Sequence, residues 1–145
     1  MIVTRFQETF RARMAEWVQS VSMATWGAIV LVSPGLFLER KEFYEPLLNI
    51  ADQTNWGIYA LCVGIIRFIF LIINGSWRPS AHMRAVGSIF SSMLWGALFI
   101  AALNLDWNIP ASAIYGGLLV LDLVSLWFSA GDAKLADLSA KGKLI

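Results

Sequence analysis

Two ionisable residues that lie inside long uncharged stretches are the candidates for chemistry in this 145-residue chain. Arg67 interrupts the apolar run 55–74, and Asp122 interrupts the apolar run 110–130. Placing either charge at the centre of a membrane helix costs roughly 2.5–3.5 kcal/mol, so such residues usually face the bundle interior and pair. An arginine–aspartate pair can fix which helices pack together, or it can form an ion or substrate site whose carboxylate exchanges a proton.

The sequence favours the structural role over proton exchange. A proton relay inside a membrane usually uses several titratable groups, and few accompany these two. His82 is the only histidine and Cys62 the only cysteine, so a zinc site of the usual type lacks ligands. No Gly-rich phosphate loop, Ser/His/Asp set or HExxH motif is present. We therefore expect a protein that is not an enzyme and that holds neither a metal nor a cofactor.

The elements that must position the two charges are apolar helices. The chain is 58% hydrophobic and 14% charged, whereas an ordinary soluble domain carries about 25% charged residues. A helix that crosses roughly 30 Å of hydrocarbon needs about 20 apolar residues. Four segments meet that need, and they predict a single all-α transmembrane domain, 1–145, built as a four-helix bundle with spans at about 18–38, 55–74, 82–103 and 110–130.

The distribution of lysine and arginine predicts the orientation of these spans. The N-terminal segment, the second connection and the tail 131–145 hold eight of these residues, whereas the opposite side holds only Arg40 and Lys41. Because cytoplasmic loops carry the excess of positive charge, both termini are predicted to be cytoplasmic. Apolar residues at helical spacing within 3–17 predict a short interfacial amphipathic helix. A straight cytoplasmic extension of the first span is the alternative.

This topology places the two buried charges at one depth. Arg67 follows Asn55 by twelve residues, and Asp122 follows Pro110 by twelve residues. At 1.5 Å per residue both lie about 18 Å below the outer interface, on two helices that run in the same direction. We therefore predict an ion pair between Arg67 and Asp122.

Other polar and small residues carry weaker signals. Glu16, at the inner edge of the first span, is expected to form a surface ion pair with Arg13 or Arg84. The acidic connection 39–54 is interpreted as a solvated loop with a short amphipathic turn at 43–50. Small residues four apart, which permit close helix approach within one chain or in a homo-oligomer, occur at Gly87 and Ser91, Ser92 and Gly96, and Ala113 and Gly117.

The stretch INGSWRPSAHMRA at 73–85 resembles a group of small membrane proteins encoded by tailed bacteriophages and prophages. The opening 4–10, and 119–122 followed by Asp132, are similar as well, so the resemblance covers most of the chain. It implies a four-span protein of the bacterial inner membrane and brings no catalytic residues. It also highlights a basic cytoplasmic turn, suited to docking or to anionic lipid, formed by Asn74, Trp77, Arg78, His82 and Arg84.

Three functions are consistent with this sequence. The first is a phage or prophage membrane protein that acts without catalysis, through membrane assembly or host-envelope interaction. The second is a holin-like pore-forming lysis protein. The third is a small proton-coupled transporter resembling the four-helix multidrug exporters, although those rely on a glutamate within the first span and Glu16 lies only at its edge. The net charge of +1 gives no reason to expect a nucleic-acid partner.

Overall fold

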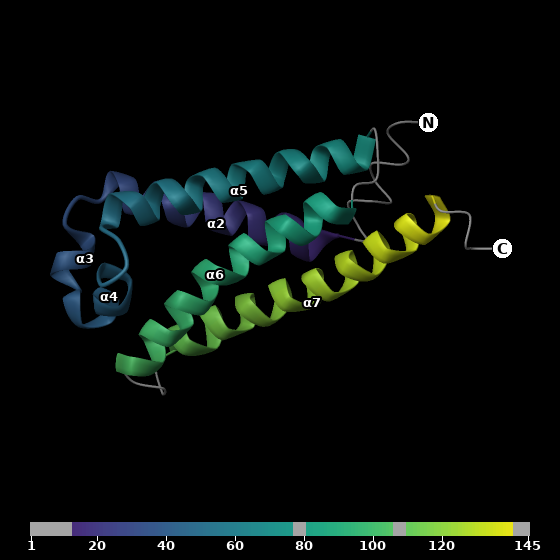
Figure 1. Ribbon diagram of the computed structural model, residues 1–145. Helices are drawn as coiled ribbons and strands as arrows, with labels where there is room; N and C mark the ends of the chain where they lie inside the picture. The colour runs from purple at the N-terminus through teal and green to yellow at the C-terminus, as the bar shows by residue number, and fades with distance from the viewer. Residues whose placement is uncertain (1–12, 77–80, 106–109, 141–145) are drawn as a thin grey trace.

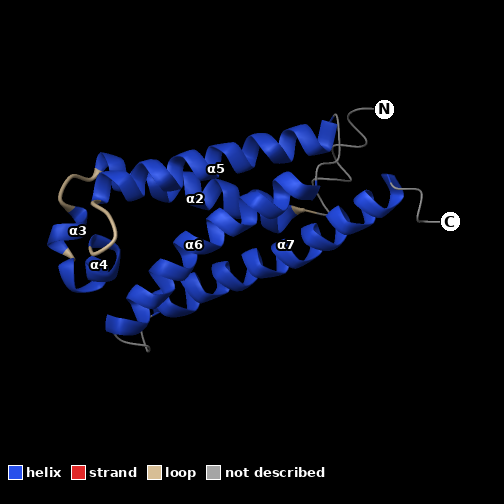
Figure 2. Cartoon of the chain, in the orientation of Figure 1, coloured by secondary structure: helices blue, strands red, loops and turns tan. Residues whose placement is uncertain are grey.

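The computed structural model describes residues 13–76, 81–105 and 110–140, and every element in these ranges is a helix (Figure 2). Two short helices, α3 and α4, lie between the first two of four long helices and sit together at one end of the molecule (Figure 1). The helices are α2 (Met14–Val32), α3 (Leu36–Glu39), α4 (Lys41–Leu48), α5 (Gln53–Ser76), α6 (Ala81–Leu105) and α7 (Pro110–Ala140).

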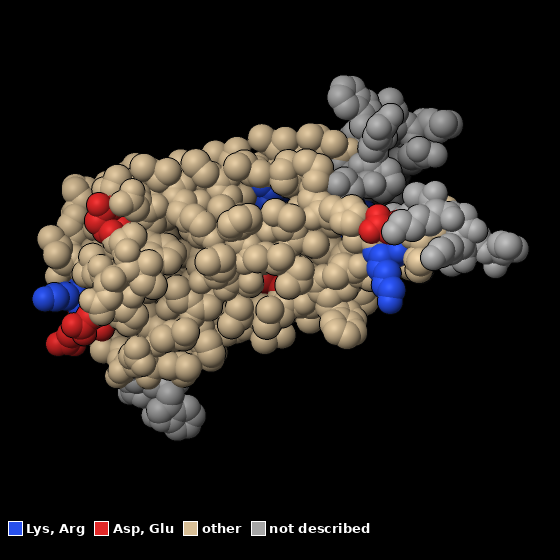
Figure 3. Space-filling model, viewed as in Figure 1, with Lys and Arg blue, Asp and Glu red and all other residues tan. Residues whose placement is uncertain are grey.

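Three of the long helices are long and apolar enough to cross a membrane, namely Gln53–Ile73, Ala81–Leu105 and Pro110–Ser139. They contain the second, third and fourth predicted spans. Charged side chains gather at the two ends of the visible face, and an almost uncharged band separates them (Figure 3). An exposed apolar surface of this extent is unusual for a protein in water. These features support placement in a membrane.

The first predicted span differs from the structure at its C-terminal end. A single helix over 18–38 is wrong, because α2 ends at Val32 and a turn separates it from α3. Pro34 disfavours helical backbone at the residue before it. Gly35 then adopts a φ of +83°, which glycine reaches without steric cost. α2 is not among the three helices that are apolar enough to cross a membrane, because polar residues lie at its start and because it ends at Val32.

The side chain of Gln53 holds the turn that follows α2. Its amide nitrogen donates to the carbonyl oxygens of Val30 and Ser33, at 2.8 and 2.6 Å. Its carbonyl oxygen accepts the backbone N–H of Phe37 at 2.9 Å. One residue at the start of α5 therefore satisfies free backbone groups at the end of α2 and the start of α3.

The start of α2 and the end of α7 also differ from the predicted boundaries. α2 runs without interruption from Met14 through Val18, as the alternative of a straight extension requires; residues 3–12 of the predicted interfacial helix lie outside the described residues. At the other end, α7 continues to Ala140, although the tail was predicted to begin at 131. Gly131 lowers helix propensity by only about 1 kcal/mol, and the flanking residues are compatible with a helix.

The long helices form two closely packed pairs, α2 with α5 and α6 with α7. The first pair depends on glycine, because a Cβ atom on Gly64 would lie 2.5 Å from the backbone nitrogen of Ala24. Gly27 likewise faces the backbone of Leu61. Such small residues let helix backbones approach in a membrane. Neither glycine belongs to the small-residue pairs predicted from the sequence.

The apolar core fills the half of the molecule nearest α3 and α4. There α4 packs against α6, and the rings of Phe37 and Tyr44 stack with centroids 4.0 Å apart. The cluster joins residues from five helices: Met23, Val30, Phe37, Tyr44, Leu47, Ala60, Leu94, Trp95, Leu98 and Ala101. The two short helices thus complete the interior between the two helix pairs at this end (Figure 1).

Candidate functional site: a buried polar network

The ion pair predicted from equal depth is present in the structure. The Nη1 atom of Arg67 on α5 lies 2.5 Å from the Oδ1 atom of Asp122 on α7. The two residues are 3% and 0% exposed, so neither charge is solvated by bulk water. A buried pair of this kind is tolerated only when the remaining polar atoms also find partners.

Those remaining atoms are satisfied by side chains of the neighbouring helices. The hydroxyl of Ser91 donates to Oδ2 of Asp122, and Nη2 of Arg67 donates to Oε1 of Gln19 at 3.1 Å, with a longer contact of 3.4 Å to Oγ of Ser88. Gln19 in turn donates to the Leu118 carbonyl oxygen at 2.8 Å. The network therefore links all four long helices through one guanidinium group.

A second network surrounds Arg84 near the start of α6. Its guanidinium donates twice to the Glu16 carboxylate, from Nη2 at 2.5 Å and from Nε at 3.1 Å, and once to Asp132 at 3.0 Å. The sequence identified the Glu16–Arg84 contact but placed it at the surface. The structure corrects that placement, because Glu16 is 6% and Arg84 8% exposed. The bidentate geometry is the strong form of a charge-assisted hydrogen bond.

Arg13, just before α2, adds a further positive charge to this region. It is half-buried, and burial lowers the pKa of its guanidinium, as does the nearby Arg84 charge. The carboxylates of Glu16 and Asp132 oppose that change in the pKa of Arg13. The region around Arg84 thus holds two cations and two anions, although the buried Nη1 atom of Arg13 has no hydrogen-bond partner among the described residues.

The buried polar residues recur at intervals of three and four along three helices, so each helix turns one polar stripe inward. The intervals are visible in the sequence, but the predicted sites depend on charged residues and not on the spacing of serine and glutamine. The stripes consist of Glu16, Gln19 and Ser20 on α2; Arg84, Ser88 and Ser91 on α6; and Asp122, Ser125 and Ser129 on α7.

Most of the buried polar residues lie in one half of the interior between the long helices; among the described residues, Ser112 near the start of α7 is the exception. One turn beyond Gln19 and Ser20 on α2 lies Met23, and one turn beyond Ser91 on α6 lies Trp95; both are buried apolar residues. Over the described residues, the polar stripes therefore end at the level of the Arg67–Asp122 pair, and the apolar core closes the other half.

Of the five residues of the predicted basic turn, only His82 and Arg84 have side chains that the structure describes, and these two do not share one exposed surface. Arg84 is buried and paired, which corrects its assignment to that surface. His82 is exposed, and its Nε2 atom lies 3.2 Å from Oδ1 of Asp137. Asn74 lies in the last turn of α5, while Trp77 and Arg78 lie outside the described residues.

Comparisons with protein-family models, with curated proteins and with solved structures found no match. The resemblance to phage and prophage membrane proteins therefore stays a prediction. Within the described ranges, no group of three or more histidine, cysteine, aspartate or glutamate residues is arranged to hold a metal ion. Geometry and burial are accordingly the basis for a functional proposal.

Proposed function

We propose that this chain is a four-span, phage- or prophage-encoded protein of the bacterial inner membrane that acts without catalysis, through membrane assembly or host-envelope interaction. The observation that carries the proposal is the completely partnered Arg67–Asp122 pair, which links four helices and leaves no free acid or base at its centre. The charge balance of the flanking segments supports cytoplasmic termini.

The burial pattern of α2 supports the proposal that this helix crosses the membrane in addition to α5, α6 and α7. Its polar residues Glu16, Gln19 and Ser20 are buried in the bundle. Its exposed residues include Val21, Ile29 and Val32, each at least half exposed. These buried polar residues lower the mean hydropathy of α2, which by itself argues against membrane insertion. Because they face the interior, however, lipid would not contact them. A helix with apolar residues outside and paired polar residues inside is suited to lipid.

The structural role of the ion pair is tested by exchanging its charges. Arg67→Asp and Asp122→Arg singly place like charges together in the interior, so each is expected to abolish the folded monomer. The double exchange should restore a large part of the stability, measured by SDS-induced unfolding of the purified protein. Asp137→Arg, at an exposed position, serves as the control and should behave as wild type. Failure of the double exchange to recover either single variant would refute the structural role.

Induced expression in growing bacteria distinguishes a protein that acts in membrane assembly from one that forms a conducting pore. The proposed function predicts normal growth and an undiminished membrane potential, because the apolar core closes the described interior beyond Asp122. A holin-like pore would instead collapse the potential and stop growth abruptly.

A proton-coupled transporter is the second candidate, and one observation favours it. The structure places Glu16, Arg84 and Asp132 near the interior stripe that leads to Asp122, which brings more titratable groups together than the sequence indicated. Proton-coupled uptake that is present in wild type and lost in Asp122→Asn, with the variant still folded, would favour transport over assembly.

A further inference from the structure

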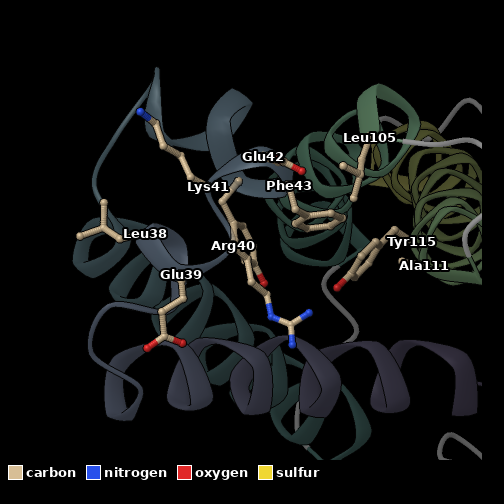
Figure 4. A pocket seen from close by; sticks show the side chains of 10 residues that line it. Leu38, Glu39, Arg40, Lys41, Glu42, Phe43, Leu105, Ala111 and Tyr115 are labelled. Atoms are coloured by element: carbon tan, nitrogen blue, oxygen red, sulfur yellow. The ribbon is translucent and has the colours of Figure 1, made fainter.

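A cavity of about 690 Å³ lies at the end of the molecule opposite the Arg84 network. Its walls come from α3, α4 and the segment between them, with Leu105 at the end of α6 and Ala111 at the start of α7 (Figure 4). The volume falls within the roughly 300–1,000 Å³ typical of small-molecule sites. No role has been assigned to this cavity so far.

Four charged side chains line the cavity, and none forms an ion pair or a side-chain hydrogen bond with any other described residue. They are two cations and two anions in succession, Glu39, Arg40, Lys41 and Glu42. All four are exposed, so a ligand can reach them without breaking an ion pair. The cavity therefore offers charges of both signs to a ligand.

Aromatic side chains form the other wall. The rings of Phe43 and Tyr115 lie with centroids 6.2 Å apart, and the Arg40 guanidinium projects between Glu39 and Tyr115 (Figure 4). The Tyr44 hydroxyl is protonated at neutral pH, because the ordinary pKa of a tyrosine is about 10; burial, and next the neighbouring Tyr115, raise the pKa of Tyr44 further, to about 12. The wall combines apolar area with hydroxyl donors.

The position of the cavity indicates which ligands reach it. It opens where α6 ends and α7 begins, which is the headgroup level if these helices cross the membrane. Leu38 and Leu105 at its margin are 72% and 44% exposed, a suitable surface for acyl chains. A guanidinium recognises phosphate, and carboxylates accept N–H groups from a primary ammonium.

We propose that this cavity binds the phosphoethanolamine headgroup of a membrane lipid, with the phosphate at Arg40 and the ammonium at Glu39, whose side chain lies on the same side of the cavity as the Arg40 guanidinium (Figure 4). Free phosphoethanolamine compounds share this chemistry, but the apolar margin favours the lipid. The inference depends on membrane placement of the helices and not on a role in assembly.

The test compares lipids of identical acyl chains on the purified full-length protein by native mass spectrometry. Phosphatidylethanolamine should be retained roughly 10-fold more than phosphatidylcholine, whose quaternary ammonium donates no hydrogen bond, and more than phosphatidylglycerol, which lacks the ammonium. Arg40→Gln should abolish the preferential retention. Glu39→Gln should reduce phosphatidylethanolamine to the phosphatidylcholine level. Glu45→Gln, exposed on the same α4 helix but outside the cavity wall, should leave retention unchanged.

Equal retention of the three lipids, or stronger retention of phosphatidylcholine through cation–π contacts, would overturn the proposal. So would an unchanged preference in the cavity variants. The wild-type lipid comparison needs no variant, so it stands even if Arg40→Gln unfolds. Binding of glycerophosphoethanolamine without a preference for the lipid would reject the lipid source. These readouts are independent of the charge exchange and growth experiments, so the two proposals fail separately.

Discussion

The guanidinium of Arg67 contacts side chains from three other helices, which makes this residue the centre of the interior. Lipid provides little hydrophobic driving force for helix association, so packing and polar contacts must select the arrangement. A buried pair adds little net stability, because its desolvation penalty offsets its Coulombic attraction. Its specificity is clearer, since no other described acid lies within ion-pair distance of Arg67.

The two acids that contact Arg84 are expected to contribute unequally. Glu16→Gln leaves the buried Arg84 charge with one exposed partner, and should destabilise the fold by about 3–5 kcal/mol. Asp132→Asn removes a carboxylate whose side chain is 56% exposed and should cost less than about 1 kcal/mol. SDS-induced unfolding of each variant measures the difference. Equal losses would contradict the larger contribution expected of Glu16.

At the scale of helices, the α2–α5 pair depends on direct backbone contact. Gly64→Ala would place a methyl group 2.5 Å from the Ala24 backbone nitrogen, so the two helices must separate. We expect a loss of about 1–3 kcal/mol, the usual cost of overpacking. The measurement is again SDS-induced unfolding, at matched protein concentration.

Gly117 on α7 provides the matched control, because a Cβ atom there meets no atom within 4 Å. Gly117→Ala should leave the monomer as stable or raise helix stability by up to about 1 kcal/mol. Ala113 and Gly117 are both exposed, so they do not pack within the described chain. A loss in Gly117→Ala comparable to that in Gly64→Ala would contradict an explanation based on the α2–α5 contact.

At the scale of the whole molecule, the contacts of Arg84 place the start of α2, the start of α6 and the later part of α7 at one end. The α3–α4 segment lies at the other end (Figure 1). If the four long helices cross the membrane, these two ends face opposite compartments. From the eight positive residues on the terminal side we then predict that the first end is cytoplasmic.

Cysteine labelling tests this orientation. In a Cys62→Ser background, single cysteines at positions 4 and 140 should react with a membrane-impermeant reagent only after the cytoplasmic face is opened. A cysteine at position 45, on α4, should react in intact cells. Labelling of positions 4 and 140 from opposite faces would reject the four-span arrangement and, with it, the shared depth that predicted the Arg67–Asp122 contact.

The apolar helices and the central ion pair were predictable because they depend on local or repetitive properties. Hydropathy is a property of each segment, and a constant rise per residue converts sequence position into depth. That arithmetic placed Arg67 and Asp122 at one level and identified their contact. The end of α2 was equally local, since Pro34 and Gly35 are visible in the sequence, but hydropathy outweighed them in the prediction.

Only the tertiary structure decided which way the other charges face. Arg84 and Glu16 resemble interfacial residues in sequence, and their burial depends on the neighbouring α7 helix, which sequence spacing does not place. The charged cavity was hidden for the same reason, because Arg40 and Tyr115 lie 75 positions apart and meet only after α3 and α4 fill the space beside α6 and α7. Hydropathy and helical rise fix depth along a helix, whereas rotation about its axis is fixed by the helices that pack against it.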